Sequence, residues 1–373
     1  MSKNITLFSL QTFSTTGGIQ KMTRILAHAL NTICTTNRWH FKFSSLYDAN
    51  SDLMPQYIPR ENFEGFNNRR MSFILKAAFA SQKQDVVILS HINLAPIGLL
   101  IRLINPKTEV WLIAHGIEVW RPLSFLKRQL LKQCDKVICV SAFTKAQMYK
   151  WHQTNPAKCI VLNNALDPFM KVPTTFQKPA YLLDRYGITD TGPVLFTLTR
   201  LASTELYKGH DRVINAVAGL KYQFPGIKYV LAGKYDHDEG ERVKQLIYAA
   251  GVTDQVILPG FIKEDELPDH FLMADVFVLP SKKEGFGIVF IEALACGLPV
   301  ICGNADGSVD AIRNGELGTA INADNETELE NCIANQLSEP LTLNKRKHLK
   351  DMCLQYFNEQ TYMSTLQKLL TND

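Results

Sequence analysis

Short apolar segments rich in β-branched residues alternate with amphipathic helical segments along nearly the whole sequence, and this alternation constrains the fold more than any other feature. We expect strands at residues 4–10, 40–47, 85–92, 109–116, 136–141 and 159–165, and again at 193–201, 227–235, 255–262, 275–281, 299–304 and 319–324. Strands that alternate with helices form parallel sheets covered on both faces. The sequence therefore predicts an α/β protein with doubly wound sheets.

A polar stretch that contains prolines, residues 167–192, separates the two series of strands. The 373 residues are enough for two domains of ordinary size. We predict an N-terminal Rossmann-like domain over residues 1–175, a C-terminal one over 176–355, and a final helix over 356–373. Because parallel sheets bind ligands at the carboxyl ends of their strands, we expect the site in a cleft between the two domains.

Composition and charge argue against several classes of protein. The eight cysteines form no C-x-x-C pair, so the sequence gives no reason to expect a zinc site. The longest apolar run, residues 86–104, is interrupted by polar residues and fits a strand, a loop and a helix better than a membrane-spanning helix. A net charge of +4 gives no reason to expect a nucleic-acid partner. We therefore expect a cytoplasmic protein.

Two glutamates flank a pair of glycines in the segment PSKKEGFGIVFIEALACGLPV, residues 280–300. Glu284 lies in the loop after a predicted strand, and Glu292 lies about 8 Å further along the helix that follows. Gly285 and Gly287 allow a close approach of the backbone, and the start of the helix offers free N–H groups to an anion. This layout suits one elongated ligand with an anionic centre and hydroxyls on both sides. A solvated Glu284 and a locally packed Glu292 fit the spacing equally well.

The segment EGFGIVFIE resembles the E-x7-E motif of the family 4 glycosyltransferases, which have the GT-B fold. The resemblance implies retaining transfer of a sugar from a nucleotide diphosphate sugar, without a metal or other cofactor. By this resemblance Glu284 binds hydroxyls of the donor sugar and Glu292 binds the ribose. The backbone around them contacts the sugar or the diphosphate, at Gly285, Phe286, Gly287 and Ile288. The final helix, residues 356–373, is expected to cross back to the first domain.

The segment TRLASTELYKGHDRVI contributes two cations, Arg200 and Lys208. Arg200 follows a predicted strand, and Lys208 precedes a predicted helix. Charge develops on a diphosphate leaving group as the glycosidic bond breaks, and fixed cations stabilise that charge without a metal ion. The two residues match the Arg and Lys of the family, although the segment between them is longer here than in many members.

Further binding residues are predicted in both domains. Gly17 and Gly18 open a helix after the first strand, and by the resemblance this pair approaches the donor phosphates and the acceptor. His115 ends a strand, and the matching family histidine lies against the donor sugar, so we expect a catalytic role for it. In the second domain, we expect Gly233 and Phe261 to lie near the base of the nucleotide.

Two other patterns leave alternatives open. Asp236 and Asp238 form an Asp-x-Asp that could hold a divalent metal, or could simply open a helix, where acidic residues suit the helix dipole. The basic segments 67–79 and 121–133 carry apolar residues at helical spacing. They could lay the first domain on the anionic inner face of the plasma membrane, or serve as ordinary core-facing helices with solvated cations.

The sequence as a whole predicts a glycosyltransferase that extends a glycan or lipid-linked saccharide acceptor, in exopolysaccharide, lipopolysaccharide or O-antigen assembly. The alternatives are a nucleotide-sugar 2-epimerase with the same fold and a non-catalytic nucleotide-sugar binder. The base and sugar of the donor, the identity of the acceptor and the oligomeric state are not specified by the sequence.

Overall fold

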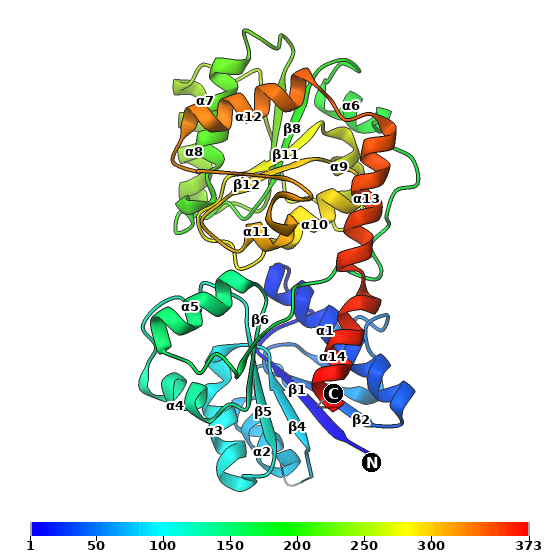
Figure 1. The fold of residues 1–373 in the computed structure, drawn as a ribbon, viewed down its shortest axis with the longest axis vertical. Coiled ribbons are helices and arrows are strands. Elements are labelled where there is room, and N and C mark those ends of the chain that lie inside the picture. Colours follow the sequence, from blue (N-terminus) through cyan, green and yellow to red (C-terminus); the bar gives the residue numbers. More distant parts are fainter. Residues whose placement is uncertain (1, 82, 372–373) are drawn as a thin grey trace. The chain divides into compact units, whose positions relative to one another are not determined.

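The computed structural model describes residues 2–81 and 83–371. These residues form two compact units: the chain up to Pro168 together with the segment from Phe357 onward, and the chain from Phe169 to Tyr356. Each unit contains one parallel sheet with helices on both faces (Figure 1). The structure therefore confirms the predicted α/β class with two doubly wound sheets. In the described part of the chain, no helix is both long enough and apolar enough to cross a bilayer.

The sheet of the first unit has the strand order β3-β2-β1-β4-β5-β6-β7. Its strands are β1 Asn4–Ser9, β2 His40–Ser45, β3 Phe63–Gly65, β4 Val86–Leu89, β5 Glu109–Ala114, β6 Lys136–Cys139 and β7 Cys159–Val161. The short edge strand β3 has no counterpart among the predicted strands. It has only three residues with a glutamate in the middle, so it lacks the apolar run that identifies the others.

The helices of the first unit cover its sheet in two groups. They are α1 Gly18–Asn37, α2 Arg70–Ser81, α3 Ala95–Ile104, α4 Phe125–Gln133, α5 Ala142–His152 and α14 Glu359–Thr371, with short 3-10 turns η1 Asn50–Asp52, η2 Arg60–Asn62 and η3 Ile92–Leu94. Helix α14 packs on α1 (Figure 1). His28 Nδ1 on α1 lies 2.6 Å from Glu359 Oε1 on α14. Helix α3 packs between α2 and α4, so these three helices form a continuous layer.

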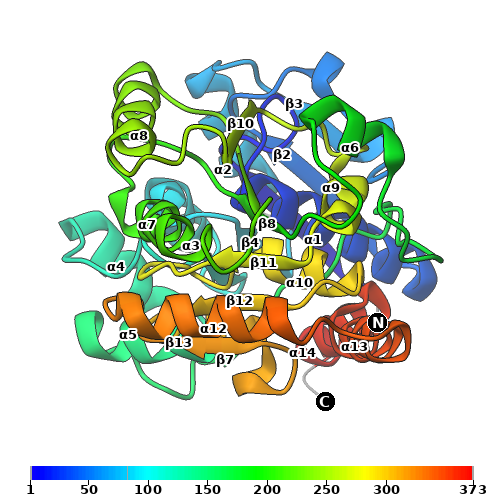
Figure 2. The same cartoon turned by 90° about the horizontal axis from the view of Figure 1, so that it is seen from above.

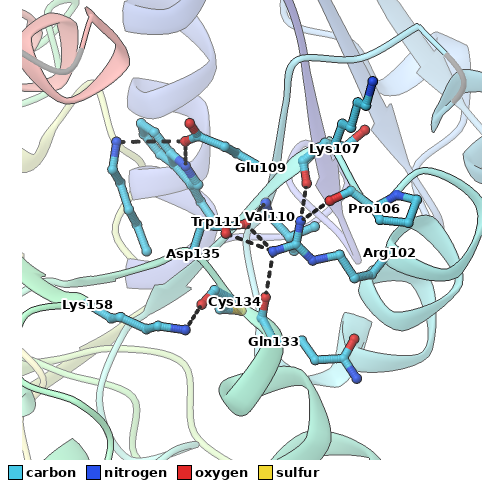
Figure 3. A network of polar contacts seen from close by, with 12 residues as sticks. Arg102, Pro106, Lys107, Glu109, Val110, Trp111, Gln133, Cys134, Asp135 and Lys158 are labelled. Atoms are coloured by element: carbon cyan, nitrogen blue, oxygen red, sulfur yellow. Dashed lines mark hydrogen bonds and ion pairs between the residues drawn. The ribbon is translucent and has the colours of Figure 1, made fainter.

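A dense polar network fixes the end of α3 to the loop before β6 (Figure 3). The guanidinium of Arg102 donates to both carboxylate oxygens of Asp135, at 2.7 Å each. It also donates to the backbone carbonyls of Pro106, Thr108 and Gln133 at 2.7–3.0 Å. Because this network satisfies carbonyls at the amino ends of the strands, we interpret it as structural.

The sheet of the second unit has the strand order β10-β9-β8-β11-β12-β13, and all of its pairs are parallel. Its strands are β8 Val194–Leu198, β9 Lys228–Ala232, β10 Val256–Gly260, β11 Val276–Leu279, β12 Val300–Gly303 and β13 Thr319–Ile321. Its helices are α6 Ala180–Tyr186, α7 His210–Leu220, α8 His237–Ala249, α9 Leu267–Met273, α10 Ile288–Ala295, α11 Ser308–Ala311, α12 Glu326–Ser338 and α13 Leu343–Phe357, with 3-10 turns η4 Leu206–Lys208 and η5 Arg313–Gly315. Helix α7 packs against α8 and α12, and α9 packs against α10 (Figures 1 and 2).

Aromatic side chains anchor α10 on the sheet of the second unit. The rings of Phe277 on β11 and Phe290 on α10 meet edge to face at 5.6 Å. Phe277 also contacts Phe196 on β8 at 5.9 Å, and all three rings are fully buried. Edge-to-face pairs of this kind add about 0.5–1.5 kcal/mol to the free energy gained by burial. The start of α10, which carries the predicted binding loop, is therefore held on a rigid support.

Candidate functional site

Loops that follow five neighbouring strands of the second unit meet at one edge of its sheet. Arg200 follows β8, Gly233 follows β9, Phe261 follows β10, and Glu284 and Asp306 follow β11 and β12. The carboxyl ends of parallel strands lie at the same edge, which is where α/β proteins bind their ligands. The candidate site of this unit is therefore this edge.

Four charged side chains form an ionic cluster at this edge. Lys208 Nζ lies 2.6 Å from Glu284 Oε1 and 4.0 Å from Glu205 Oε2. Glu205 also forms an ion pair with Arg200. The side chain of Lys208 is only 12% exposed, whereas that of Arg200 is 70% exposed. The structure thus brings together the predicted residues Arg200, Lys208 and Glu284, and it adds Glu205, which the sequence did not single out.

Gly209 allows Lys208 to reach this cluster. The residue has a φ of +79°, and a Cβ atom there would lie 2.5 Å from the carbonyl oxygen of Pro280. Only glycine combines this left-handed conformation with such a close approach to a neighbouring backbone. The 3-10 turn that carries Lys208 therefore packs directly against the end of β11 before α7 begins.

A buried carboxylate, Asp306, holds the Glu284 loop in place. Its two oxygens accept hydrogen bonds from the backbone N–H groups of Glu284 (2.7 Å) and Ser308 (2.9 Å). The N–H of Gly307 donates to the carbonyl of Glu284 at 2.8 Å, and a Cβ at Gly307 would lie 2.1 Å from the carbonyl oxygen of Gly285. The loops after β11 and β12 therefore form one tightly packed unit.

Burial, together with the nearby charge of Glu284, raises the pKa of Asp306 from its ordinary value of 3.8 to about 7. The carboxyl group of Asp306 thus binds its proton more tightly in the folded protein than in the unfolded chain. Protonated Asp306 therefore contributes to the free energy of unfolding. This contribution is complete below pH 3.8, the ordinary pKa, and it is lost as the pH rises through the pKa of the folded protein.

We therefore expect the free energy of unfolding to fall as the pH rises from about 4 to about 7 because of Asp306. In Asp306→Asn this contribution should disappear, so the two pH profiles should differ in slope by about 1.4 kcal/mol per pH unit, the value for one proton. Denaturant unfolding of the full chain across this range measures the slopes. The exposed Asp265→Asn serves as the control, and parallel profiles for the wild type and Asp306→Asn would contradict this prediction.

The remaining residues of the predicted motif lie at the start of α10 and inside it. Gly287 has a φ of +79° and precedes the first residue of the helix, Ile288. Phe286, in the turn before the helix, is buried. Glu292 is only 4% exposed, and it makes an interaction within the protein. A local packing role for Glu292 is thus compatible with its burial.

Gly233 and Phe261 occupy neighbouring strand ends. Gly233 has a φ of +144°, and a Cβ there would lie 1.7 Å from the carbonyl oxygen of Thr199, the residue before Arg200. Its N–H donates to the carbonyl of Gly260 at 2.8 Å. Phe261, in contrast, is more than half exposed. Gly233 thus allows the ends of three strands to lie close together, and Phe261 offers an aromatic surface beside them.

In the first unit, the Gly17-Gly18 turn follows a loop that Asp48 organises. Asp48 is fully buried, and it accepts hydrogen bonds from three consecutive backbone N–H groups, residues 12–14, at 2.7, 3.1 and 2.8 Å. Helix α1 then begins at Gly18. One carboxylate that satisfies several backbone donors makes this loop rigid.

His115 lies in a second organised turn of the first unit, after β5. Its Nε2 donates to the carbonyl of Ser90 at 2.9 Å, and its own backbone N–H donates to Glu118 at 2.6 Å. Burial lowers the pKa of His115 to about 4, so the imidazole is neutral at pH 7. Because Nε2 carries the proton, Nδ1 is the nitrogen that can accept a hydrogen bond.

The Asp-x-Asp sequence is used for helix capping. Asp236 accepts hydrogen bonds from the backbone N–H groups of Glu239, in the first turn of α8, and of Ser203, both at 2.8 Å. The hydroxyl of Ser203 also donates to it at 3.1 Å, so the carboxylate already has three donors, and its contact with Glu239 is that of an N-cap aspartate. Among residues 2–81 and 83–371, no group of three or more His, Cys, Asp or Glu side chains is placed to hold a metal ion.

Two family models match the chain, and together they cover most of it. A model described as Glycosyl transferases group 1 matches residues 183–352, and one described as Glycosyltransferase Family 4 matches residues 32–168. The chain belongs to the family 4 glycosyltransferases. The resemblance based on the E-x7-E segment is thereby confirmed.

The relatives of this chain include enzymes that are named for the transfer of different sugars. A GDP-mannose-dependent α-(1-6)-phosphatidylinositol monomannoside mannosyltransferase of Mycolicibacterium smegmatis is 29% identical over 238 residues, 61% of this chain and 60% of the relative. An α-D-kanosaminyltransferase of Streptomyces kanamyceticus is 28% identical over 176 residues, 47% of this chain and 44% of the relative. The match thus spans less than two thirds of the length of either relative.

Solved structures of similar proteins show that this chain has the GT-B fold. HepE from Anabaena in complex with UDP has a TM-score of 0.80 at 19% identity, with 99% of this chain and 100% of that chain covered. The lipopolysaccharide outer core galactosyltransferase WaaB in its apo form has a TM-score of 0.73 at 16% identity, with 99% of each chain covered.

Sequence reasoning missed two residues at this edge of the sheet, Glu205 of the ionic cluster and Asp306 beside it. Glu205 lies three residues before Lys208, a spacing at which side chains of a turn can meet, and this was the available signal. Asp306 had no local signal, because its partner Glu284 is 22 residues away.

Proposed function

We propose that this protein transfers a sugar from a nucleotide diphosphate sugar to a glycan or a lipid-linked saccharide, with retention of the anomeric configuration. The observation that carries the proposal is the ion pair between Lys208 and Glu284 at 2.6 Å, beside Arg200 and the glycine turn that opens α10. Cations, backbone N–H groups and a carboxylate are the groups needed to hold a diphosphate and the hydroxyls of a sugar.

In this proposal, each group has a defined role. Arg200 and Lys208 bind the diphosphate and stabilise the charge that develops on it as the glycosidic bond breaks. Glu284 binds hydroxyls of the sugar, and Glu292 binds the ribose. The backbone of residues 285–288 contacts the diphosphate or the sugar, and Gly233 and Phe261 border the base.

The first unit contributes the Gly17-Gly18 turn and His115 to the same reaction. The neutral imidazole of His115 offers Nδ1 as an acceptor for a hydroxyl group of the sugar. Asp48 holds the loop before the Gly17-Gly18 turn, and Glu118 holds the turn that carries His115. Rigid support of this kind is what a binding site requires in order to position its ligand.

An acceptor in exopolysaccharide, lipopolysaccharide or O-antigen assembly is the finer form of this proposal. One relative is named for a phosphatidylinositol-linked substrate, and one structure with the same fold is a lipopolysaccharide galactosyltransferase. Both names support an acceptor that is attached to a lipid. No metal ion takes part in the proposed reaction, because protein cations compensate the charge of the diphosphate.

The experiment is a thermal-shift screen of UDP-, GDP- and dTDP-sugars, followed by incubation with the labelled donor that gives a shift. Release of nucleoside diphosphate that depends on a saccharide acceptor is the expected result, and a chelator should leave the rate nearly unchanged. An isomeric sugar formed without an acceptor would instead identify a 2-epimerase. Strong inhibition by the chelator, reversed by manganese, would contradict the metal-free mechanism.

We also propose that the layer of α2, α3 and α4 attaches the first unit to an anionic membrane surface. Apolar side chains that are more than half exposed lie on these helices, at Met71, Leu75, Phe79, Leu103 and Phe125. We call this set the membrane face. Exposed cations accompany it, at Arg70, Lys83, Lys107 and Arg128. Apolar side chains bordered by cations are typical of surfaces that bind anionic lipids.

Replacing Met71 and Phe79 together by serine is expected to weaken binding to vesicles that contain phosphatidylglycerol by about tenfold or more, since each buried CH₂ contributes ~0.8 kcal/mol. Sedimentation of the full chain with vesicles measures the change. Tyr222→Ser, which removes an equally exposed aromatic side chain from the second unit, is the matched control. Equal binding of all three proteins, or equal binding to phosphatidylcholine alone, would contradict the proposal.

A further inference from the structure

Glu205 places a carboxylate between the two cations that the proposed function assigns to the diphosphate. One of its oxygens pairs with Arg200, and the other lies 4.0 Å from Lys208 Nζ. Lys208 simultaneously contacts Glu284 at 2.6 Å. The four side chains carry two positive and two negative charges, so the cluster is neutral as it stands.

A neutral cluster is a poor binding site for a diphosphate. The phosphate oxygens need the donors of Arg200 and the positive charge of Lys208. Glu205 accepts from Arg200 and places its other oxygen 4.0 Å from Lys208, so its negative charge acts on both cations. A carboxylate that remained beside the bound phosphates would also repel them. The ligand-free arrangement thus has to change before both cations can contact the diphosphate.

The local structure permits this change without moving the backbone. The N–H of Glu205 donates to the carbonyl of Ala202 at 2.7 Å, and its carbonyl accepts from the N–H of Lys208 at 3.1 Å. These bonds fix the main chain of the turn and do not involve the side chain of Glu205, so the exchange requires a change of that side chain alone. Its partner Arg200 is 70% exposed, so the guanidinium can exchange the carboxylate for a phosphate at little cost.

We propose that Glu205 is an internal counter-ion that holds Arg200 and Lys208 when no diphosphate is bound, and that the donor displaces it. The inference rests on the proposed function, since it requires that the two cations bind the diphosphate. After transfer, Glu205 competes with the nucleoside diphosphate product for the same cations and so accelerates its release. Glu205 is therefore a positioning residue that weakens diphosphate binding in order to allow turnover.

The test uses Glu205→Gln, which keeps the size of the side chain and removes its charge. Titration calorimetry of the full chain with inorganic pyrophosphate should show about tenfold tighter binding in this variant, equivalent to ~1.4 kcal/mol. With the donor identified in the screen, KM and kcat should both fall, because the product leaves more slowly. Glu241→Gln, which removes an exposed, ion-paired carboxylate from the same unit, is the matched control and should behave like the wild type.

The outcomes separate this inference from the proposed function. If pyrophosphate binds the wild type and Lys208→Met abolishes that binding, the diphosphate site is supported. Unchanged or weaker pyrophosphate binding in Glu205→Gln, with an unchanged melting temperature, then overturns the counter-ion role alone. If pyrophosphate binds neither the wild type nor Glu205→Gln, the diphosphate site itself is wrong, and the role of Glu205 falls with it.

Discussion

Replacing Lys208 by methionine is expected to lower kcat/KM for sugar transfer by about 10³-fold, the upper range for the loss of one group that stabilises transition-state charge. Methionine matches the unbranched shape of lysine but provides no charge. Lys208 is largely buried and lies between Glu284 and Glu205, at 2.6 and 4.0 Å. Its loss therefore removes a cation from the diphosphate and leaves the carboxylate of Glu284 without the counter-charge of Lys208.

The readout for Lys208→Met is the rate of nucleoside diphosphate release with a saturating acceptor. Lys244→Met removes an exposed, ion-paired lysine from the same unit, and it should retain the wild-type rate. Arg200→Ala should also slow transfer, but less, because its exposed side chain is more easily replaced by water or ions. A kcat/KM for Lys208→Met within threefold of the wild type would remove Lys208 from the proposed mechanism.

Replacing Glu292 by alanine is expected to weaken the binding of the nucleoside diphosphate by about 10- to 100-fold. Hydrogen bonds to a charged group contribute about 1.5–3 kcal/mol each, and we assign such bonds between Glu292 and the hydroxyls of the ribose. The effect should be confined to ligands that contain a ribose. Inorganic pyrophosphate, which has none, should bind Glu292→Ala and the wild type equally.

Calorimetry with both ligands therefore distinguishes the two roles of Glu292 that the sequence left open. A loss of affinity for the nucleotide alone supports the ribose contact. Equal losses for both ligands indicate that the buried side chain only supports the start of α10. Glu292→Gln adds a further control, because it keeps the packing of the helix and removes the charge.

Much of the fold could be predicted from the sequence because its causes are local. The β-branched apolar segments, the amphipathic helices between them and the turn at Gly287 each depend on a few consecutive residues. The run at residues 86–104 illustrates this, since it forms β4, η3 and α3 as its interruptions predicted. Edge strand β3 was not predicted, because a strand of three residues with a central glutamate is too short to show an alternating apolar pattern.

The sequence also identified Arg200, Lys208 and Glu284, but it did not show how they are connected. Their arrangement follows from the strand order β9-β8-β11-β12. In this order β8 and β12 both neighbour β11, so the loops after β8 and β12 lie on either side of the loop after β11.

For Asp236, the structure decided between two roles that the sequence left open. Its pattern allowed a metal ligand or an acidic residue that favours the start of a helix, and the contacts with Ser203 and Glu239 show that it caps α8.

The amino-acid sequence by itself thus determined the α/β class, the two series of strands and the charged residues at the strand ends, because these depend on short-range periodicity and turn chemistry. Only the tertiary structure decided that Glu205 lies between the two cations and that Asp306 holds the Glu284 loop. The carboxylate of Asp306 meets its partner across two neighbouring strand ends, and Glu205 can bridge its cations only when the turn packs against β11. Contacts of this kind depend on the order of the strands in the sheet, and a short stretch of sequence does not specify that order.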